Sequence, residues 1–283
     1  MTIHAFDQLI CPLDATPLQR HDSCWRCPQG HSFDIASQGY LHLLPVQMKR
    51  SRDPGDSKDM VSARRRFLGL GHYQPIASAV SAATLAAGAG DQTLNCLDAG
   101  CGEGYYLQQL IHNTPDNITL ALAGLDISKW AVLAAAKADK RSAWIVGTNA
   151  RLPIQDASLD RLLCLFGFPV YPEFLRALKP GGRLIQVDAG PQHLRELREI
   201  IYPSLKPERS GQRENPAGFE CHSQSTLNFS FKLDTQAQIA DLLLMTPHLF
   251  RATAEGRARA QALHSLQLTA EVTISCYESL KTD

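Results

Sequence analysis

The 283-residue sequence lacks an excess of charge of either sign, and it lacks a long apolar run. It has 28 Lys and Arg residues against 28 Asp and Glu residues, so its formal net charge is zero. Zero net charge argues against a protein that coats nucleic acid by bulk electrostatics, because counterion release needs a cationic surface. A local basic patch stays compatible with this balance. No segment approaches the roughly 20 uncharged apolar residues that span a bilayer.

The amino terminus also lacks the features of a secretory leader. Residues 1–10 include His4 and Asp7 and show no basic segment followed by an apolar one. We therefore expect a cytoplasmic protein. The 8 cysteines are too scattered for a secreted disulfide scaffold, which favours reduced thiols with one metal cluster at most.

Three regions of different composition predict a small amino-terminal domain, a linker and a large domain. Residues 1–45 are rich in Cys, His, Pro and short turns, with brief β-like runs such as 40–44. Residues 46–72 hold seven Lys or Arg residues against three Asp residues, a local net charge of +4. They predict a basic linker that leads into a helix, although such a run is also typical of a solvated connector.

Residues 73–283 alternate strands and helices, which predicts an α/β fold built on a doubly wound parallel sheet. Strands are expected at residues 94–99, 120–126, 143–146, 161–166, 183–188 and 271–276. Helices are expected at residues 76–89, 105–111, 129–140, 172–178, 193–201, 235–245 and 252–268.

Three glycines at alternate positions, Gly100, Gly102 and Gly104, follow the first of these strands. Glycines there let the backbone approach a ligand closely. A dinucleotide-binding loop would have its third glycine one residue later and would hold a pyrophosphate. Asp98 and Glu103 would repel a pyrophosphate, but they suit a ligand with ammonium and sulfonium charges. The loop therefore favours S-adenosylmethionine over NAD.

Asp126 ends the next predicted strand, 22 positions after Gly104. A carboxylate at the carboxyl end of a strand can accept hydrogen bonds from both ribose hydroxyls. A lone aspartate in such a place is more often a helix cap. Its spacing of one strand–helix–strand unit from the glycine loop favours ribose binding.

A group of metal-binding residue types lies near the amino terminus. Cys11, Cys24, Cys27 and His31 have the spacing C-x12-C-x2-C-x3-H. Four N and S donors on short turns suit tetrahedral Zn²⁺, and zinc could fold a segment whose core is too small to fold unaided. The alternative is that the thiols are simply buried.

Residues 94–190 resemble the class I S-adenosylmethionine-dependent methyltransferases. The glycine loop and Asp126 carry the likeness. Residues 147–160 resemble the family's adenine-side loop and fourth strand, and residues 178–184 its turn into the fifth strand. The resemblance implies a Rossmann-like sheet and S-adenosylmethionine as cofactor, but it does not identify the substrate.

Further stretches resemble the large-subunit (23S) ribosomal RNA guanine-N1-methyltransferases. These stretches are residues 27–34, 39–40, 43–47, 49–57, 71–75 and 190–194, and the likeness covers most of residues 9–250. The resemblance implies methyl transfer to N1 of one guanine in an RNA hairpin, with RNA bound by the amino-terminal module and the basic run. It also suggests a homodimer that holds RNA between two such modules.

In that family zinc is held by C-x2-C and C-x3-H, which corresponds to Cys11, position 14, Cys27 and His31. This sequence has Asp14 at the second position. Three alternatives are open: Asp14 supplies an oxygen ligand, Cys24 replaces the missing thiolate, or zinc has been lost. We favour Cys24, because thiolate binds zinc better than a lone carboxylate does.

The two resemblances also imply the residues that contact S-adenosylmethionine. The ribosomal RNA family implies Tyr73, Gly102, Glu103 and His193, and the wider class adds Asp98, Gly100, Gly104 and Asp126. Because N1 of neutral guanine carries a proton, a base is needed, and the sequence does not identify it. Phe166, Phe168 and Asp188 lie where substrate enters this fold, with stacking and plain packing both open for the two aromatic residues.

Two other functions stay open. A small-molecule methyltransferase with an amino-terminal cap would turn over a small acceptor, and neutralising Arg64, Arg65 and Arg66 would not affect it. An inert RNA-binding adaptor would not bind S-adenosylmethionine, and the intact glycine loop argues against it. The sequence does not indicate which guanine is methylated.

Overall fold

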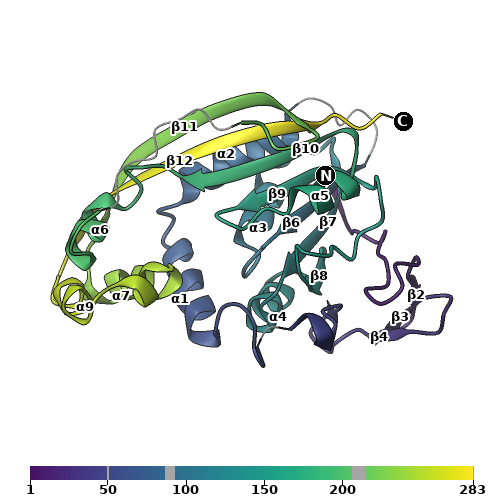
Figure 1. The fold of residues 1–283 in the computed structure, drawn as a ribbon, viewed down its shortest axis with the longest axis horizontal. Coiled ribbons are helices and arrows are strands. Elements are labelled where there is room, and N and C mark those ends of the chain that lie inside the picture. Colours follow the sequence, from purple (N-terminus) through teal and green to yellow (C-terminus); the bar gives the residue numbers. More distant parts are fainter. Residues whose placement is uncertain (50, 87–92, 206–213, 283) are drawn as a thin grey trace.

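The computed structural model is built on one large mixed sheet, and it describes residues 1–49, 51–86, 93–205 and 214–282 (Figure 1). The strands of the large sheet are β1 (Thr2–Ala5), β5 (Tyr40–His42), β6 (Leu94–Ala99), β7 (Thr119–Asp126), β8 (Ala143–Val146), β9 (Leu159–Leu165), β10 (Leu178–Ala189), β11 (Phe219–Leu233) and β12 (Leu266–Ser279). A small separate sheet contains β2 (Gln19–His21), β3 (Cys24–Arg26) and β4 (Ser32–Asp34).

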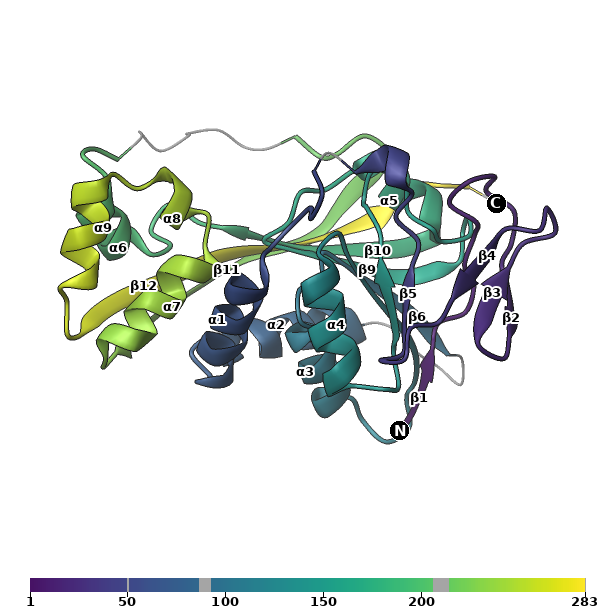
Figure 2. The ribbon, with the colours of Figure 1, turned by 90° about the horizontal axis from the view of Figure 1, so that it is seen from below.

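The described helices cover and extend this sheet. They are α1 (Lys58–Gly69), α2 (Gln74–Leu85), α3 (Tyr105–Asn113), α4 (Lys129–Ala138), α5 (Tyr171–Ala177), α6 (Arg195–Ile201), α7 (Gln236–Met245), α8 (His248–Arg251) and α9 (Ala254–Gln261), with one 3-10 turn at Val46–Met48. Figures 1 and 2 show α6–α9 and the small sheet at opposite ends of the molecule. No described helix combines the length and apolarity needed to cross a bilayer.

The strand order is β11-β12-β10-β9-β6-β7-β8-β5. Strands β5 to β10 pair in parallel, and β12 is antiparallel to both of its neighbours. The order reverses between β6 and β9, and the crevice at the carboxyl ends of such strands is where open α/β sheets bind ligands. The predicted Rossmann-like α/β fold is confirmed.

Two apolar cores lie on the two faces of the sheet. Strand β6 is buried along its whole length, as a strand covered on both faces should be. Its side chains alternate between the cores, with Cys96 in the core that includes Leu107 and Leu97 in the core that includes Leu9. The second core therefore contains residues of the amino-terminal segment.

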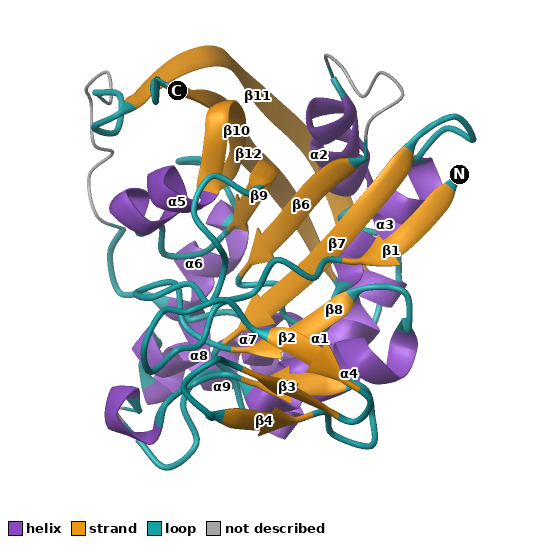
Figure 3. Ribbon diagram, turned by 90° about the vertical axis from the view of Figure 1, so that its right-hand side faces the viewer, coloured by secondary structure: helices purple, strands orange, loops and turns teal. Residues whose placement is uncertain are grey.

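The amino-terminal segment joins the large sheet at two places. Strands β1 and β8 lie along the same edge of β7, with Thr2 opposite Thr119 and Val146 opposite Asp126 (Figure 3). Strand β5 then continues the sheet beyond β8. The predicted division into residues 1–45, 46–72 and 73–283 stays a prediction, but the structure joins the first region to the third through shared strands and a shared core.

The carboxyl-terminal part differs from the prediction. The predicted helix at residues 252–268 is wrong in its last part, because α9 ends at Gln261 and β12 begins at Leu266. Pairing with β11 over residues 266–279 outweighs the helical pattern there. Strand β11 is not predicted at all. Most of its side chains are exposed, so it lacks the apolar alternation by which strands are recognised.

Candidate functional site

The glycine loop lies at the carboxyl end of β6, where the strand order reverses. Gly100, Gly102 and Gly104 have φ values of 104°, 56° and 84°, which are left-handed and favour glycine. A Cβ atom at Gly104 would lie 2.6 Å from Trp144, so this glycine is needed for packing. A Cβ atom at Gly100 would meet no atom within 4 Å. The loop therefore leaves open space in front of its first glycine.

Two buried carboxyl groups beside the loop have no partner. Asp98 is 1% exposed and Glu103 is 5% exposed, and none of their carboxylate oxygens forms a hydrogen bond with a described residue. Burial, followed by the charges of Asp126 and Glu103, raises the pKa of Asp98 to about 8. Burial also raises the pKa of Glu103, although Arg64 opposes this. Unpaired buried carboxyl groups are costly, which indicates a ligand with positively charged or hydrogen-bond donor groups.

Asp126 connects the end of β7 to the glycine loop. One carboxylate oxygen accepts the Gly102 N–H at 3.0 Å, and the other accepts the Ser128 N–H at 2.8 Å. Burial raises the pKa of Asp126, while these two N–H groups lower it. Asp126 thus caps the turn before α4 and also fixes the glycine loop, and carboxylate oxygens can each accept a further hydrogen bond.

Arg64 on α1 covers the glycine loop. Its guanidinium pairs with Asp56, and it also donates to the carbonyl oxygen of Met245 at 3.4 Å. Although burial alone would lower it, the carboxylates of Asp56, Glu103 and Asp126 raise the pKa of Arg64. Arg64 belongs to the basic run that is expected to contact RNA, but it lies instead at the glycine loop, on the part of α1 where Ala63 and Phe67 are buried.

The segment that carries Asp56 lies on the turn between β7 and α4. The Ser128 hydroxyl donates to the carbonyl oxygen of Asp56 at 2.6 Å. A Cβ atom at Gly55 would come within 2.8 Å of Ile127 and 2.9 Å of Ser128, so only glycine allows this close approach. We call residues 51–57 the strap, because they run across the cofactor side of the sheet.

Tyr73, Phe166 and His193 form an aromatic group near the glycine loop. The Tyr73 hydroxyl lies 3.1 Å from Nε2 of His193, and the Phe166 ring stacks on Tyr73 with the centroids 6.1 Å apart. Burial lowers the pKa of His193 to about 4, so its ring is neutral at pH 7 and Nε2 can accept the Tyr73 hydroxyl. Nδ1 of His193 then carries the proton and forms no close hydrogen bond with a described residue, although an interaction with the backbone of Glu271 raises the pKa of the ring against the effect of burial.

The ends of β9 and β10 face the substrate side. Phe166 has a φ of 54°, and Phe168 is 88% exposed. At the end of β10, the Asp188 carboxylate accepts the amide N–H of Gln186 at 2.8 Å. The amide oxygen of Gln186 in turn accepts the Tyr171 hydroxyl at 3.1 Å. A chain of hydrogen bonds therefore positions Asp188.

The candidate metal centre gathers Cys11, Asp14, Cys27 and His31. One ligand atom from each lies within 4.8 Å of the other three. Nδ1 of His31 lies 2.9 Å from Asp14, 3.4 Å from the Cys27 sulfur and 3.5 Å from the Cys11 sulfur. Hydrogen bonds from the Thr16 hydroxyl and backbone N–H lower the pKa of Asp14, which keeps it ionised. Two thiols, an imidazole and a carboxylate form a donor set that fits tetrahedral zinc.

The structure does not bring Cys24 into this group. Cys24 is buried on β3, opposite His21 and Asp34 of the neighbouring strands. Strand β3 ends at Arg26, so Cys27 lies on the following turn with His31, whereas Cys24 is held in the strand. Asp14 occupies the fourth place instead of the favoured Cys24.

The basic run of the predicted linker divides between different surroundings. Arg64 lies at the glycine loop. Arg66 forms a bidentate ion pair with Asp241 of α7. Lys49 and Arg52 line a pocket beside the strap. Arg65 is exposed. The described residues of the run therefore lie in several different surroundings.

Comparison with known proteins gives two matching family models and several relatives. A zinc-ribbon model described as "RlmA, N-terminal" matches residues 9–52, and one described as "Methyltransferase domain" matches residues 97–186. A Streptomyces fradiae protein named 23S rRNA (guanine(748)-N(1))-methyltransferase is 33% identical over 276 residues, which cover 94% of this chain and 95% of the relative.

Two further relatives have the same extent. A Micromonospora griseorubida protein, provisionally named a 23S rRNA (guanine-N(1)-)-methyltransferase, is 33% identical over 96% of this chain and 97% of its own length. A Bacillus subtilis protein with the same provisional name is 32% identical over 95% of this chain and 96% of its own length. The likeness therefore includes the metal-binding segment, the glycine loop and the carboxyl-terminal strands.

Proposed function

Because the chain belongs to the 23S rRNA guanine-N1-methyltransferases, we propose that it methylates N1 of one guanine in a hairpin of large-subunit ribosomal RNA. The observation that carries this proposal is the pair of buried, unpartnered carboxyl groups, Asp98 and Glu103, at a glycine loop on the strand-order reversal. Such a site suits a cationic cofactor and no phosphate. A cytoplasmic location belongs to the proposal, since the RNA substrate is met there.

The residues proposed to bind S-adenosylmethionine are those expected from the sequence, with Arg64 added. They are Arg64, Tyr73, Asp98, Gly100, Gly102, Glu103, Gly104, Asp126 and His193. When bound, S-adenosylmethionine supplies a methyl group activated by the charge of the sulfonium. Asp98 and Glu103 stabilise positive charge, Asp126 accepts from ribose hydroxyls, and Arg64 and the Nδ1–H of His193 donate to the carboxylate end. These roles use every partnerless atom described above.

The proposed entry for the target guanine is the pair of strand ends at β9 and β10. Phe168 is exposed there and offers a face on which an extruded base can stack. The Watson–Crick edge of guanine presents two donors, N1–H and N2–H, and a carboxylate matches both. We assign Asp188 as the group that accepts the N1 proton, because Gln186 and Tyr171 hold it in place.

The amino-terminal segment is proposed to hold Zn²⁺ through Cys11, Asp14, Cys27 and His31. Its role there is structural, since four protein ligands leave no open coordination position. The metal would fix the two turns on either side of β2 and β3, and with them the surface offered to RNA. A homodimer is part of the proposal as well, and light scattering of the purified protein would give the mass of two chains.

Incubation with labelled S-adenosylmethionine and unmethylated large-subunit RNA, followed by primer extension, tests the proposed function. An N1-methyl group blocks guanine pairing, so we expect one strong polymerase stop at a hairpin guanine. Assembly intermediates and complete particles serve as additional substrates. Absence of incorporation into any of these, together with turnover of a small acceptor, would replace the RNA substrate by a small molecule.

A further inference from the structure

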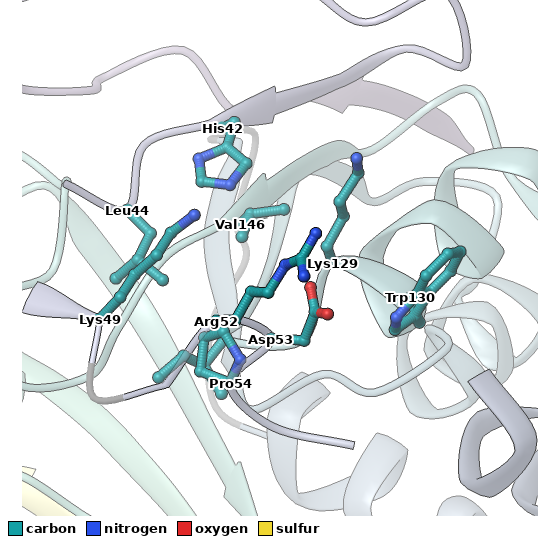
Figure 4. Close-up of a pocket in the computed structure, with 10 residues that line it drawn as sticks. His42, Leu44, Lys49, Arg52, Asp53, Pro54, Lys129, Trp130 and Val146 are labelled. Atoms are coloured by element: carbon teal, nitrogen blue, oxygen red, sulfur yellow. The ribbon is translucent and has the colours of Figure 1, made fainter. Parts of the chain in front are cut away.

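A small basic pocket lies at the amino-terminal end of the strap, whose residues Arg52, Asp53 and Pro54 line it (Figure 4). It is formed by the end of β5 and the nearby Leu44, by Lys49 and residues 52–54, by the end of β8 and by the start of α4. Three cations, Lys49, Arg52 and Lys129, line it against one carboxylate, Asp53, with Trp130 at one side. The basic run as a whole is expected to contact RNA, but no defined site has been assigned to Lys49 or Arg52, and no role has been given to Lys129 or Trp130.

The three cations have no counter-ion of their own. Their side chains form no ion pair or hydrogen bond with another described residue, whereas Arg64 and Arg66 of the same basic run are both paired with aspartates. Lys49 and Lys129 act on the pocket's histidine as well. Burial first, and then these two ammonium groups, lower the pKa of His42, so it adds no charge. The lining is therefore cationic and prepared for an anion.

The dimensions of the pocket restrict the size of that anion. Its cavity volume is about 30 Å³, whereas a single buried water needs only about 10 to 15 Å³. The enclosed space is about two to three times that minimum, so it can take the non-bridging oxygens of a phosphate group but is too small for a whole nucleoside. Trp130 is 37% exposed beside it, so the sugar or base attached to a bound phosphate would meet an indole ring.

The position of the pocket connects it to the active site. Lys129 begins α4, immediately after Ser128, and Ser128 bonds both Asp126 and the strap. Arg52 and Asp56 lie at the two ends of the same strap, so one short segment lines the pocket and the cofactor side. On the other side, β5 leads directly from the small sheet with the metal centre. A strand of RNA that contacts both the metal-binding segment and the catalytic cleft would pass this point.

We propose that this pocket binds a phosphodiester group of the ribosomal RNA substrate, through Arg52, Lys129 and Lys49, with the adjoining nucleotide against Trp130. The inference rests on the proposed function and adds a defined contact for the RNA backbone. Phosphate contacts fix the register of a nucleic acid without reading its sequence. The pocket would thus position the hairpin relative to the strand ends where the guanine enters.

The test measures binding of an unmethylated rRNA hairpin fragment at several salt concentrations by fluorescence anisotropy. Arg52→Gln and Lys129→Gln are compared with the unmodified protein, and Lys137→Gln, an exposed position on the same helix α4, is the matched control. For each pocket variant we expect about tenfold weaker binding and a salt slope smaller by about 0.7 to 0.9, the value for one lost phosphate contact. Lys137→Gln is expected to change neither quantity.

Two further readouts separate this pocket from its alternatives. Calorimetry with S-adenosylmethionine is expected to give the same affinity for all variants, and an affinity that falls together with RNA binding would place the pocket in the cofactor site and overturn the proposal. The fluorescence of Trp130, obtained by difference from Trp130→Phe, is titrated with hairpin RNA and with inorganic phosphate. Tight saturation by inorganic phosphate alone would identify a small-anion site instead.

The proposal and the function on which it rests fail differently. If the unmodified protein methylates the hairpin while the double variant Arg52→Gln, Lys129→Gln keeps the same salt slope, the pocket proposal falls and the function stands. If the unmodified protein binds and methylates no form of the ribosomal RNA, both fall together.

Discussion

The Tyr73 hydroxyl lies 3.1 Å from Nε2 of His193, although 120 positions separate the two residues. Tyr73 precedes α2, and His193 lies in the turn between β10 and α6. The hydrogen bond fixes the tautomer of His193 and leaves its Nδ1–H as a buried donor on the cofactor side. This hydrogen bond therefore links Tyr73, at the start of α2, to the loop between β10 and α6.

Replacing Tyr73 by Phe is expected to weaken S-adenosylmethionine binding by about tenfold, because Nε2 of His193 loses its partner and the tautomer is no longer fixed. Calorimetry measures this. The chain offers a matched control in Tyr202, whose hydroxyl lies 2.8 Å from Nδ1 of His248 outside the site. Tyr202→Phe removes the same kind of bond and should leave cofactor affinity unchanged. Equal losses in both variants would point to a general effect on folding.

Arg64 and Arg65 are neighbours with different predicted roles. Arg64→Gln leaves Asp56, Glu103 and Asp126 without their shared cation, so we expect a loss of cofactor affinity on the order of a hundredfold, about 3 kcal/mol. Arg65 is exposed, and Arg65→Gln should bind S-adenosylmethionine normally. Circular dichroism and thermal melting show whether the first variant is folded. If Arg64→Lys restores cofactor binding only in part, the planar guanidinium as well as the charge is needed.

Binding of S-adenosylmethionine should strengthen as the pH rises from about 6 to about 8. The pKa of Asp98 is raised to about 8 in the free protein, so the carboxyl group is mostly protonated at pH 6. A cationic ligand favours the ionised form, so at low pH binding must release this proton, which lowers the affinity. The same shift means that the free protein loses stability as the pH rises from about 4, the unfolded value, to about 8. Asp98→Asn should weaken the affinity and flatten its pH dependence in calorimetry. A pH-independent affinity of the unmodified protein would contradict this.

The purified protein is expected to contain one zinc ion per chain by elemental analysis. Asp14→Ala should lose zinc, because it removes a ligand from the group around His31, whereas Cys24→Ser should retain it. Asp14→Cys recreates a C-x2-C pair with Cys11 and should hold zinc more tightly against a chelator. Zinc that disappears in Cys24→Ser and persists in Asp14→Ala would reverse the assignment.

Asp188→Asn should lower kcat by about 10² to 10⁴, the range for loss of a proton acceptor, with little change in cofactor affinity. The amide oxygen of asparagine can still accept the N–H of Gln186, so the fold at the end of β10 should be preserved. Single-turnover methylation measures the effect. A variant with an unchanged methylation rate would exclude Asp188 as the acceptor.

The sequence predicts some elements well because their signals are local. Strands β6 and β8 have the predicted bounds, since each is an apolar run limited by turn residues. The glycine loop and Asp126 also occur together as expected. Arg64 could not be distinguished from the adjacent arginines, because only tertiary packing of α1 on α7 makes it a cofactor-side residue. Asp14, and not Cys24, lies at the fourth position of the candidate metal centre. The geometry of two turns decides this, and residue type alone does not predict it.

The pairing of β1 with β7 has a consequence for how the chain reaches its fold. Thr2 and its neighbours pair with residues 119–122, more than 110 positions along the chain, so this edge of the sheet has high contact order and is expected to form late. Before this pairing forms, zinc bound at the proposed metal site would keep the amino-terminal segment ordered. Removing residues 1–45 would also bare the edges of β7 and β8, which become templates for aggregation. Besides holding the proposed metal site, the segment therefore covers an edge of the sheet that would otherwise be exposed.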